Sequence, residues 1–324
     1  MRWIFNRLAP GGAGGRLSVL IFHRVLAGPD PLLPDEFDAV RFEMVCGWLR
    51  RWFNVIALDT AARQLAQGTL PERPLAITFD DGYTDNHDVA LPILRRYALP
   101  ATFFVATGFL DGGRMWNDTV IEAVRCTPHE TLDLRGVECG HLGIRRVRGI
   151  DEKRNAIAAI IDGIKYLPQP QRDAIVGCIA ARCGATLPDN LMMRSEQVAA
   201  LRRAGMQIGA HTVTHPILAT LSPGAARDEI VNGKRRLEAI IDEPVSLFAY
   251  PNGRPDRDYT AQTVALVREA GFDAAVTTAW GAAGAGVDPF QIPRFTPWDR
   301  TQLRFGLRLA HTLWASRRGA AVAA

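Results

Sequence analysis

Two adjacent carboxylates end an apolar stretch in the first third of the chain. Residues 75–79 read Leu-Ala-Ile-Thr-Phe, and Asp80, Asp81 and Gly82 follow directly. A short apolar run bounded by turn residues is typical of a buried strand, so both aspartates should lie where that strand leaves the core. Neighbouring carboxylates repel each other, and a cation relieves the repulsion. We expect one aspartate to bind a metal and the other to act as a base, although a helix-capping pair would give the same letters.

Two of the seven histidines, His211 and His215, follow a second predicted strand at residues 207–210. Pro216 disfavours helical geometry at His215, so the two imidazoles should converge from the strand end and its loop. Two imidazoles with one carboxylate leave coordination positions open for water and substrate. Such a set is catalytic rather than structural in type, whereas either histidine alone would be an ordinary core or surface residue.

Two more strand ends carry candidate residues. The loop at residues 250–253 reads Tyr-Pro-Asn-Gly, and such a loop lets a backbone N–H approach a ligand, as an oxyanion hole requires. Taken alone it would be a plain turn. Arg294 lies in a short predicted strand at residues 291–295, where it can hold a carboxylate ionised or form a surface ion pair.

The elements that must position these residues alternate in type. Strands are predicted at residues 17–22, 55–58, 75–79, 101–106, 207–210, 245–250, 274–277 and 291–295, and helices at 35–52, 59–67, 85–97, 197–204, 224–241, 260–270 and 300–315. Alternating strands and helices with short connections indicate a mainly parallel sheet covered by helices. Residues 108–192 interrupt this pattern, and we interpret them as a largely helical insertion that contains Trp116.

Composition excludes several classes of protein. With 324 residues, 48% hydrophobic and 22% charged, the chain has the composition of a folded globular protein. A net charge of +4 without a dense basic run gives no reason to expect nucleic acid as a partner. Five cysteines without CxxC spacing argue against a disulfide framework or a cysteine zinc site, so we expect reduced, buried thiols at Cys46, Cys126, Cys139, Cys178 and Cys183.

The two ends of the chain differ from its middle. The repeated strand–helix unit suggests a barrel. We assign residues 1–16 to a basic arm with a glycine-rich flexible linker, 17–299 to this barrel with its insertion, and 300–324 to a basic helix and tail. Both ends mix Trp, Phe and Leu with Arg, which is typical of helices on a membrane surface. A packed terminal helix with a solvated basic face would have the same residue composition, and we prefer this interpretation. No secretory signal or spanning stretch is seen, so a cytoplasmic location is expected, with peripheral contact at the inner membrane as a second interpretation.

Three motifs together resemble a known family. Thr78-Phe79-Asp80-Asp81-Gly82, His211-x-x-x-His215 and Phe248-Ala249-Tyr250-Pro251-Asn252-Gly253, in this order and at strand ends, resemble the polysaccharide deacetylases. This family is also called carbohydrate esterase family 4 or the NodB-like domain. The similarity covers about residues 17–107 and 194–298. It implies an α/β fold, a distorted (β/α) barrel of about seven mainly parallel strands.

The resemblance also implies chemistry. It predicts a divalent metal, usually Zn²⁺, and hydrolysis of the N-acetyl groups of an acetylated amino-sugar oligo- or polysaccharide. Asp80 resembles the catalytic base, and the ligands by this resemblance are Asp81, His211 and His215. The backbone N–H of Asn252 resembles the oxyanion donor. We expect the sugar to contact Tyr250, Pro251, Gly253 and, in the insertion, Trp116.

Two departures from the family pattern bear on mechanism. An arginine found in the third motif of many members is replaced by Ala249, and we hypothesise that Arg294 supports Asp80 instead. A late Leu-x-His segment has no clear match, because Leu309-Ala310-His311 falls in the predicted terminal helix. His23, at the end of the first strand, resembles the Tyr-His of related members, and we assign it as proton donor or substrate contact.

The leading hypothesis is a metal-dependent glycan deacetylase in bacterial exopolysaccharide or cell-envelope metabolism. Since two family features are missing, a catalytically weakened glycan-binding protein is an alternative. A two-histidine, one-carboxylate iron oxygenase is another. That site usually occupies an all-β scaffold with its ligands close in sequence, whereas Asp81 precedes the histidines by about 130 residues.

Overall fold

Seven parallel strands form the sheet that carries the candidate residues. In the order of their pairing they are β1 (Ser18–Phe22), β5 (Pro74–Phe79), β6 (Thr102–Val105), β9 (Gln207–Ala210), β10 (Leu247–Ala249), β11 (Ala274–Trp280) and β12 (Ile292–Arg294). The short β4 (Asn54–Val55) pairs with the start of β5. Beyond β12, the N–H of Phe295 donates to the Val19 carbonyl at 2.7 Å, and the N–H of Ile21 to the Phe295 carbonyl at 3.1 Å. These bonds join the last strand to the first, and the predicted distorted (β/α) barrel is confirmed.

This computed structural model describes residues 1–136 and 142–317, so Cys139 lies outside the described residues. The chain divides into two units. The first comprises Met1–Gly28, Asp35–Leu110 and Met193–Ala324, and the second Pro29–Pro34 and Asp111–Met192. The barrel belongs entirely to the first unit.

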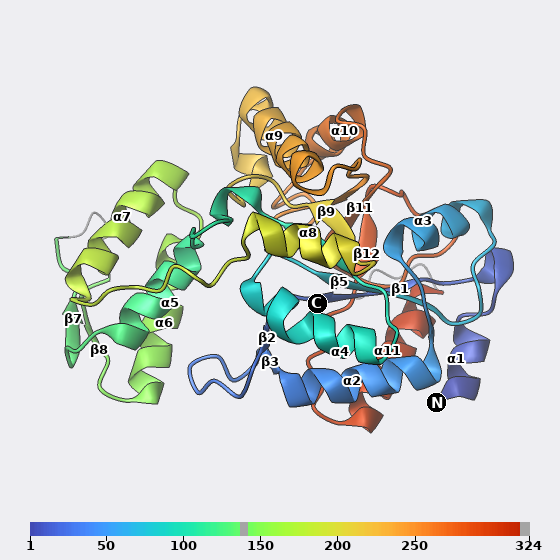
Figure 1. Ribbon diagram of the computed structural model, residues 1–324, viewed down its shortest axis with the longest axis horizontal. Helices are drawn as coiled ribbons and strands as arrows, with labels where there is room; N and C mark the ends of the chain where they lie inside the picture. The colour runs from blue at the N-terminus through green and yellow to red at the C-terminus, as the bar shows by residue number, and fades with distance from the viewer. Residues whose placement is uncertain (137–141, 318–324) are drawn as a thin grey trace. The chain divides into compact units, whose positions relative to one another are not determined.

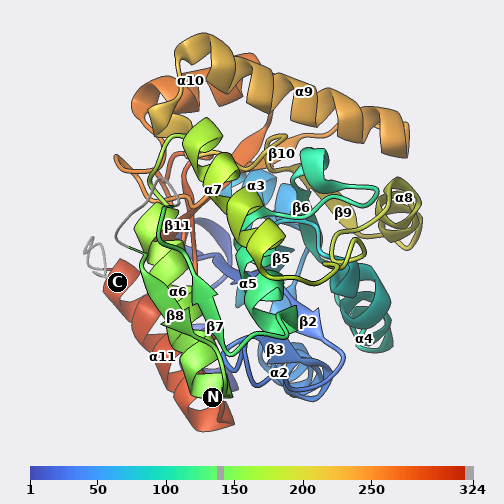
Figure 2. The same ribbon diagram turned by 90° about the vertical axis from the view of Figure 1, so that its left-hand side faces the viewer.

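Helices cover the barrel strands (Figure 1). They are α1 (Arg2–Leu8), α2 (Ala39–Trp52), α3 (Leu58–Gln67), α4 (Leu91–Arg96), α8 (Ser195–Arg203), α9 (Pro223–Ile241), α10 (Ala261–Glu269) and α11 (Gln302–Ser316), with a π-helical turn η2 (Asn86–Ala90) before α4. The neighbours α9 and α10 lie side by side in both views (Figures 1 and 2). Every residue of β1 and β5 is buried, which explains why both strands read as continuous apolar runs.

The predicted helix at residues 35–52 begins later than expected. Phe37 and Asp38 form a short strand, β3, that pairs with β2 (Val25–Leu26). The helix starts at Ala39 because the Asp38 carboxylate accepts the N–H of Arg41 at 2.8 Å, as an N-cap does.

The amino-terminal segment packs on the barrel unit, where a flexible linker was expected. Phe5 of α1 is fully buried and contacts Trp52 and Phe53, with ring centroids 5.9 and 4.5 Å away. The N–H of Gly12 donates to the Leu70 carbonyl at 2.8 Å, which holds the glycine-rich turn in place. The aromatic side chain of Phe5 therefore anchors this segment, and the domain boundaries assigned from sequence stay predictions.

The second unit is largely helical, as expected of the insertion. It contains α5 (Trp116–Cys126), α6 (Ile150–Ile164), α7 (Gln169–Arg182) and a small antiparallel pair, β7 (Thr131–Asp133) with β8 (Ile144–Arg146) (Figure 2). A core of its own includes Val120, Ile160 and Ile179. Half-buried Trp116 lies in this unit with the Arg172 guanidinium 4.9 Å from its ring, so its predicted sugar contact stays a prediction.

The described cysteines are free thiols, but they are not all buried. Cys46 and Cys183 are buried, Cys126 is half-buried and Cys178 is exposed. Burial raises the pKa of the Cys46 thiol. Among the described helices, none combines the length and apolar character needed to cross a bilayer.

Candidate metal and catalytic site

The carboxyl ends of the parallel strands bring the candidate residues to one end of the barrel. The pairing of β5 with β1 continues one residue beyond the strand, since the Asp80 N–H donates to the Phe22 carbonyl at 2.9 Å. The chain then turns through positive φ angles, 77° at Asp81 and 93° at Gly82. A side chain at position 82 would place its Cβ 2.9 Å from Cγ1 of Val105, so only glycine fits this turn. The turn directs the two neighbouring carboxylates to different partners.

Asp81 faces the two histidines. Its Oδ1 lies 3.5 Å from Nε2 of His211 and 3.5 Å from Nε2 of His215, and the imidazole centroids are 4.7 Å apart. His211 continues β9, while His215 lies in the loop beyond it with a φ of 54°. The three residues predicted as ligands are therefore brought together, with donor atoms all within 4.8 Å of one another.

These three side chains fit a divalent cation. Oδ1 of Asp81 and Nε2 of His211 are buried and have no hydrogen-bond partner among the described residues, although unpaired buried polar atoms are costly. Nδ1 of His211 lies 2.7 Å from the Ala249 carbonyl, which fixes the proton on Nδ1 and directs the Nε2 lone pair at Asp81. Two imidazole nitrogens and one carboxylate oxygen are a donor set suited to Zn²⁺.

Asp80 faces Arg294. The two guanidinium nitrogens Nη1 and Nη2 donate to the two carboxylate oxygens at 2.7 Å each, and neither side chain is more than 3% exposed. Nε of Arg294 donates to the Thr277 carbonyl at 2.8 Å, so the guanidinium is held in one orientation. Oδ2 of Asp80 is 3.9 Å from Nε2 of His211, which places this carboxylate beside the candidate metal ligands.

Burial and neighbouring charge oppose each other at the two aspartates. Burial raises the pKa of Asp80, but the positive charges of Arg294, His211 and His23 outweigh it, so its pKa lies below the usual value. For Asp81, burial likewise raises the pKa, and His211, His215 and His23 bring it below the usual value. Both carboxylates are therefore ionised at neutral pH.

The two histidines respond differently to the same surroundings. Burial lowers the pKa of His215 to about 4, so its imidazole is neutral at pH 7. Burial also lowers the pKa of His211, but the charges of Asp80 and Asp81 outweigh it and leave the pKa above the usual value. To hold a cation at Nε2, His211 would have to be neutral, because a ligating imidazole carries no proton on the ligating nitrogen.

The loop after β10 presents a backbone donor. Asn252 adopts a φ of 59°, and its N–H donates no hydrogen bond to any described residue. The neighbouring groups are paired, since the Gly253 N–H donates to the Pro251 carbonyl at 2.6 Å and the Thr278 hydroxyl to the Asn252 carbonyl at 2.6 Å. Tyr250 is fully buried and stacks on Tyr259 at 4.0 Å. This position gives the predicted sugar contact of the Tyr250 side chain no support.

His23 is an exposed residue immediately after β1. Its carbonyl accepts a hydrogen bond from Nδ2 of Asn86 at 2.8 Å, and the next residue, Arg24, pairs with Asp85 at 2.8 Å. These contacts fix the segment that carries the imidazole. A positive charge on this imidazole would lower the pKa of both aspartates, so His23 lies near the site.

One residue of the site was not identified from the sequence. Oε2 of Glu229, on α9, accepts the backbone N–H groups of Val213 and Thr214 at 2.8 Å each, and Oε1 accepts the Thr214 hydroxyl at 2.7 Å. Through these three hydrogen bonds, Glu229 fixes the loop that connects the two histidines. A glutamate in the polar half of a helix has no pattern that distinguishes it; the positive φ angles of Thr212 and His215 are the feature that requires such support.

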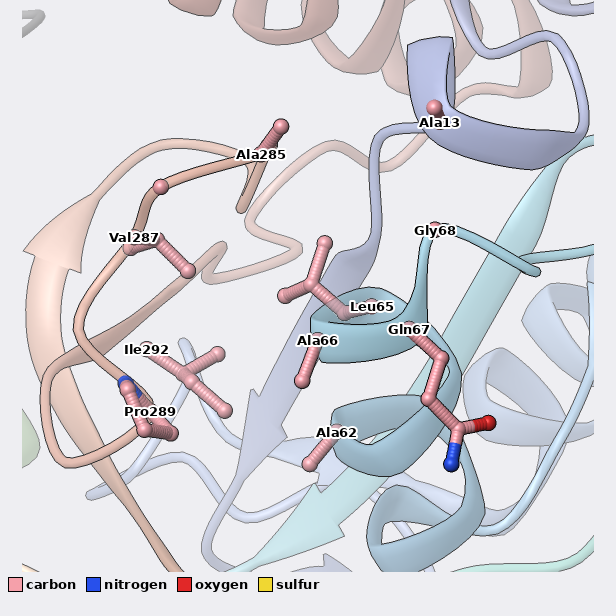
Figure 3. Close-up of a pocket in the computed structure, with 12 residues that line it drawn as sticks. Ala13, Ala62, Leu65, Ala66, Gln67, Gly68, Ala285, Val287, Pro289 and Ile292 are labelled. Carbon is pink, nitrogen blue, oxygen red and sulfur yellow. The ribbon is translucent and has the colours of Figure 1, made fainter.

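A cavity of about 300 Å³ lies between the last turns of α3, the glycine-rich turn before β1 and the loop that leads into β12 (Figure 3). Its lining is mainly apolar and includes Leu65, Val287 and Ile292, with Gln67 as a polar exception. None of the described residues that line it has a titratable side chain. This cavity therefore offers no acid, base or metal ligand of the kind that Asp80 and Asp81 provide at the carboxyl ends of the strands.

Comparisons with known proteins agree with this arrangement. The family model described as polysaccharide deacetylase matches residues 67–131 and 177–275, half of the chain. Among curated proteins, "Putative polysaccharide deacetylase YxkH" of Bacillus subtilis (strain 168) is 22% identical over 281 residues, covering 86% of this chain and 70% of that protein.

Solved structures share the fold. IcaB from Ammonifex degensii matches with a TM-score of 0.59 and 20% identity, covering 94% of this chain and 98% of that one. The Streptococcus pyogenes deacetylase PplD, in complex with acetate, matches with a TM-score of 0.58 and 18% identity, covering 87% of this chain and 92% of that one. At these identities the likeness shows a common fold.

Proposed function

Because the chain belongs to the polysaccharide deacetylase family, hydrolases that act on amide bonds, we propose that it removes N-acetyl groups from an acetylated amino-sugar glycan. The proposed setting is bacterial exopolysaccharide or cell-envelope metabolism. One observation carries the proposal: the donor atoms of Asp81, His211 and His215 converge, with the paired carboxylate of Asp80 beside them.

Asp81, His211 and His215 would hold a divalent cation, with Zn²⁺ as the first candidate. When bound there, the cation supplies Lewis-acid polarisation of the acetyl carbonyl and lowers the pKa of water. The carbonyl of Ala249 keeps His211 in the tautomer that has a free Nε2. The cost of leaving two buried polar atoms unpaired is then offset by binding.

Asp80 is the proposed general base. Arg294 keeps its carboxylate ionised and fixed, while the second lone pair of each oxygen stays available to accept a proton from the attacking water. Arg294 thereby supplies the cation that many family members place at the position of Ala249. It acts through Asp80, so it is a positioning residue.

The backbone N–H of Asn252 is the proposed donor to the oxyanion that forms when water adds to the acetyl carbonyl. The nitrogen of the leaving amino sugar must gain a proton when its bond to carbon breaks. We assign this to His23, since the segment that carries it is fixed by Asn86 and Asp85 and its charge reaches both aspartates. Pro251, Gly253 and Trp116 remain proposed sugar contacts.

We also propose a cytoplasmic location with peripheral contact at the inner membrane. The arginines near both chain ends support the membrane contact.

An acetate-release assay tests the proposed function. The full chain, freed of metal with a chelator and then supplied with Zn²⁺ or Co²⁺, should release acetate from N-acetylglucosamine oligomers or a related acetylated glycan. His211→Ala should abolish the release, whereas His311→Ala, which removes an exposed histidine on α11, should preserve it.

Three results would contradict the proposal. Release that persists without metal or in His211→Ala would exclude the mechanism. Glycan binding without acetate release under any divalent metal would favour a weakened glycan-binding protein. Bound iron with oxygen consumption would favour the oxygenase.

A further inference from the structure

Helix α11 is apolar on two opposite sides. Phe305, Leu309 and Leu313 are fully buried in the barrel unit. On the other side, Leu303, Leu307 and Trp314 are 64%, 53% and 44% exposed. With half-buried Ala310 they recur at spacings of four, three and four residues, which places all four within an arc of about 60° on a helix. We call these four residues the outer stripe.

Basic residues border the outer stripe. Arg304, Arg308 and His311 lie along one side and Arg317 along the other, as the helical periodicity requires. Arg308 pairs with Asp299 at 2.9 Å, while the sequences of α11 and α1 contain no aspartate or glutamate. The surface around the outer stripe therefore combines exposed leucine and tryptophan with positive charge.

Helix α1 packs against α11 and extends this surface. The side chain of Met1 lies at Gly306, where any added Cβ would meet it. Trp3 of α1 is 69% exposed, with the Arg7 guanidinium 5.2 Å from its ring. Trp298, between β12 and α11, is 53% exposed. Both ends of the described chain thus contribute exposed tryptophan and arginine.

We propose that the outer stripe docks on a bilayer surface that contains anionic lipid, with α11 lying along the interface. Leucine and tryptophan side chains on one face of a helix enter the headgroup region, and flanking arginines bind the negative headgroups while their stems cover apolar surface. A second copy of the chain is a poor occupant, because the same basic residues border its outer stripe and would repel those of this copy.

Docking would also set the orientation of the barrel. The helices of such a barrel run antiparallel to its strands, so the amino-terminal end of α11 lies at the end of the barrel where Asp80 and Arg294 lie. Leu303 and Trp298 belong to that end. The inference does not depend on the proposed hydrolysis, because binding is measured without glycan.

Vesicle co-sedimentation of the full chain tests the proposal. The protein should sediment with vesicles of phosphatidylcholine mixed with phosphatidylglycerol, remain in solution with phosphatidylcholine alone, and dissociate in high salt. Leu303→Glu combined with Leu307→Glu should lower the lipid affinity at least about tenfold. A matched pair, Ile144→Glu with Tyr166→Glu, removes apolar residues that are 51% and 50% exposed in the second unit and should leave binding unchanged.

Circular dichroism checks that both pairs fold. If the leucine variant does not fold, Arg304→Gln with Arg317→Gln takes its place and should weaken binding to the anionic vesicles about tenfold. Absence of sedimentation with anionic vesicles would overturn the proposal. An equal loss of lipid affinity in the matched pair and in the leucine pair would also overturn it. A dimer in light scattering that Leu303→Glu with Leu307→Glu dissociates would instead assign the outer stripe to self-association, and also overturn it.

Discussion

Asp80 is a buried carboxylate whose two oxygens both accept hydrogen bonds from a single arginine. The geometry is bidentate, and Arg294 itself is anchored on the Thr277 carbonyl and lies 3.2 Å from the Thr78 hydroxyl. A fixed guanidinium keeps the carboxylate charged and in one rotamer. Asp81, one residue later, lies beside two imidazoles instead, so two chemically identical neighbours have different partners.

Replacing Arg294 should affect chemistry more than substrate binding. In Arg294→Met the buried Asp80 loses its bidentate guanidinium partner. We therefore expect kcat to fall on the order of 10²-fold with KM nearly unchanged, and the free energy of unfolding to drop by about 3–5 kcal/mol. Arg294→Lys keeps the charge but loses the bidentate geometry. It should therefore retain a higher kcat and a higher free energy of unfolding than Arg294→Met. Steady-state kinetics and denaturant unfolding measure these effects.

Arg268→Met is the matched control, because Arg268 forms a half-exposed pair with Asp288. We expect a change in unfolding free energy below about 1 kcal/mol and unchanged kinetics. An unaltered kcat in Arg294→Met would contradict the positioning role.

At the residue level, the sequence predicted the members of the site better than their surroundings. Residue type and position at strand ends selected the aspartate pair with His211 and His215, and the family resemblance named Asp81 rather than Asp80 as the ligand. Arg294 lies 214 residues after Asp80 in the sequence. Neither composition nor spacing indicates that these two side chains pair, so their contact could only be hypothesised. The buried position of Tyr250 could not be read from its motif, because it depends on stacking with Tyr259 from the following loop.

At the scale of elements, helix α9 determines the shape of the loop that carries the histidines. Glu229 accepts three hydrogen bonds from that loop. Four residues further along the helix, a Cβ at Gly233 would lie 2.9 Å from the Thr212 carbonyl carbon, so helix and loop are in direct backbone contact. The positive φ angles of Thr212 and His215 are kept by this support.

Removing the Glu229 carboxylate should therefore weaken metal binding without removing a ligand. In Glu229→Ala the two backbone N–H groups lose their acceptor, and the loop no longer fixes His211 relative to His215. We expect Zn²⁺ affinity, measured by titration calorimetry, to fall about 10- to 100-fold. Asp228→Ala removes the exposed carboxylate that directly precedes Glu229 in the same helix, and it should leave the Zn²⁺ affinity unchanged. Equal affinities in the two variants would refute the supporting role.

At the scale of the whole molecule, alternation of apolar runs and helical patterns was enough to predict a parallel barrel. Buried parallel strands must be apolar on both faces, and this leaves a clear trace in β1 and β5. The first residue of a helix depended on local contacts that the pattern did not predict. For α2 this contact is the cap formed by the Asp38 carboxylate. The packing of the amino-terminal segment depended on Phe5 reaching Trp52 and Phe53, a long-range contact without a sequence pattern.

In the proposed mechanism, the two adjacent aspartates divide the chemistry between metal binding by Asp81 and proton transfer by Asp80. The most direct test measures zinc content and acetate release on the same preparation of Asp80→Asn. Because Asp80 is not a proposed ligand, we predict zinc content equal to that of the wild type, with acetate release lowered by about 10²- to 10⁴-fold. Loss of zinc in this variant, or acetate release at the wild-type rate, would contradict the claim.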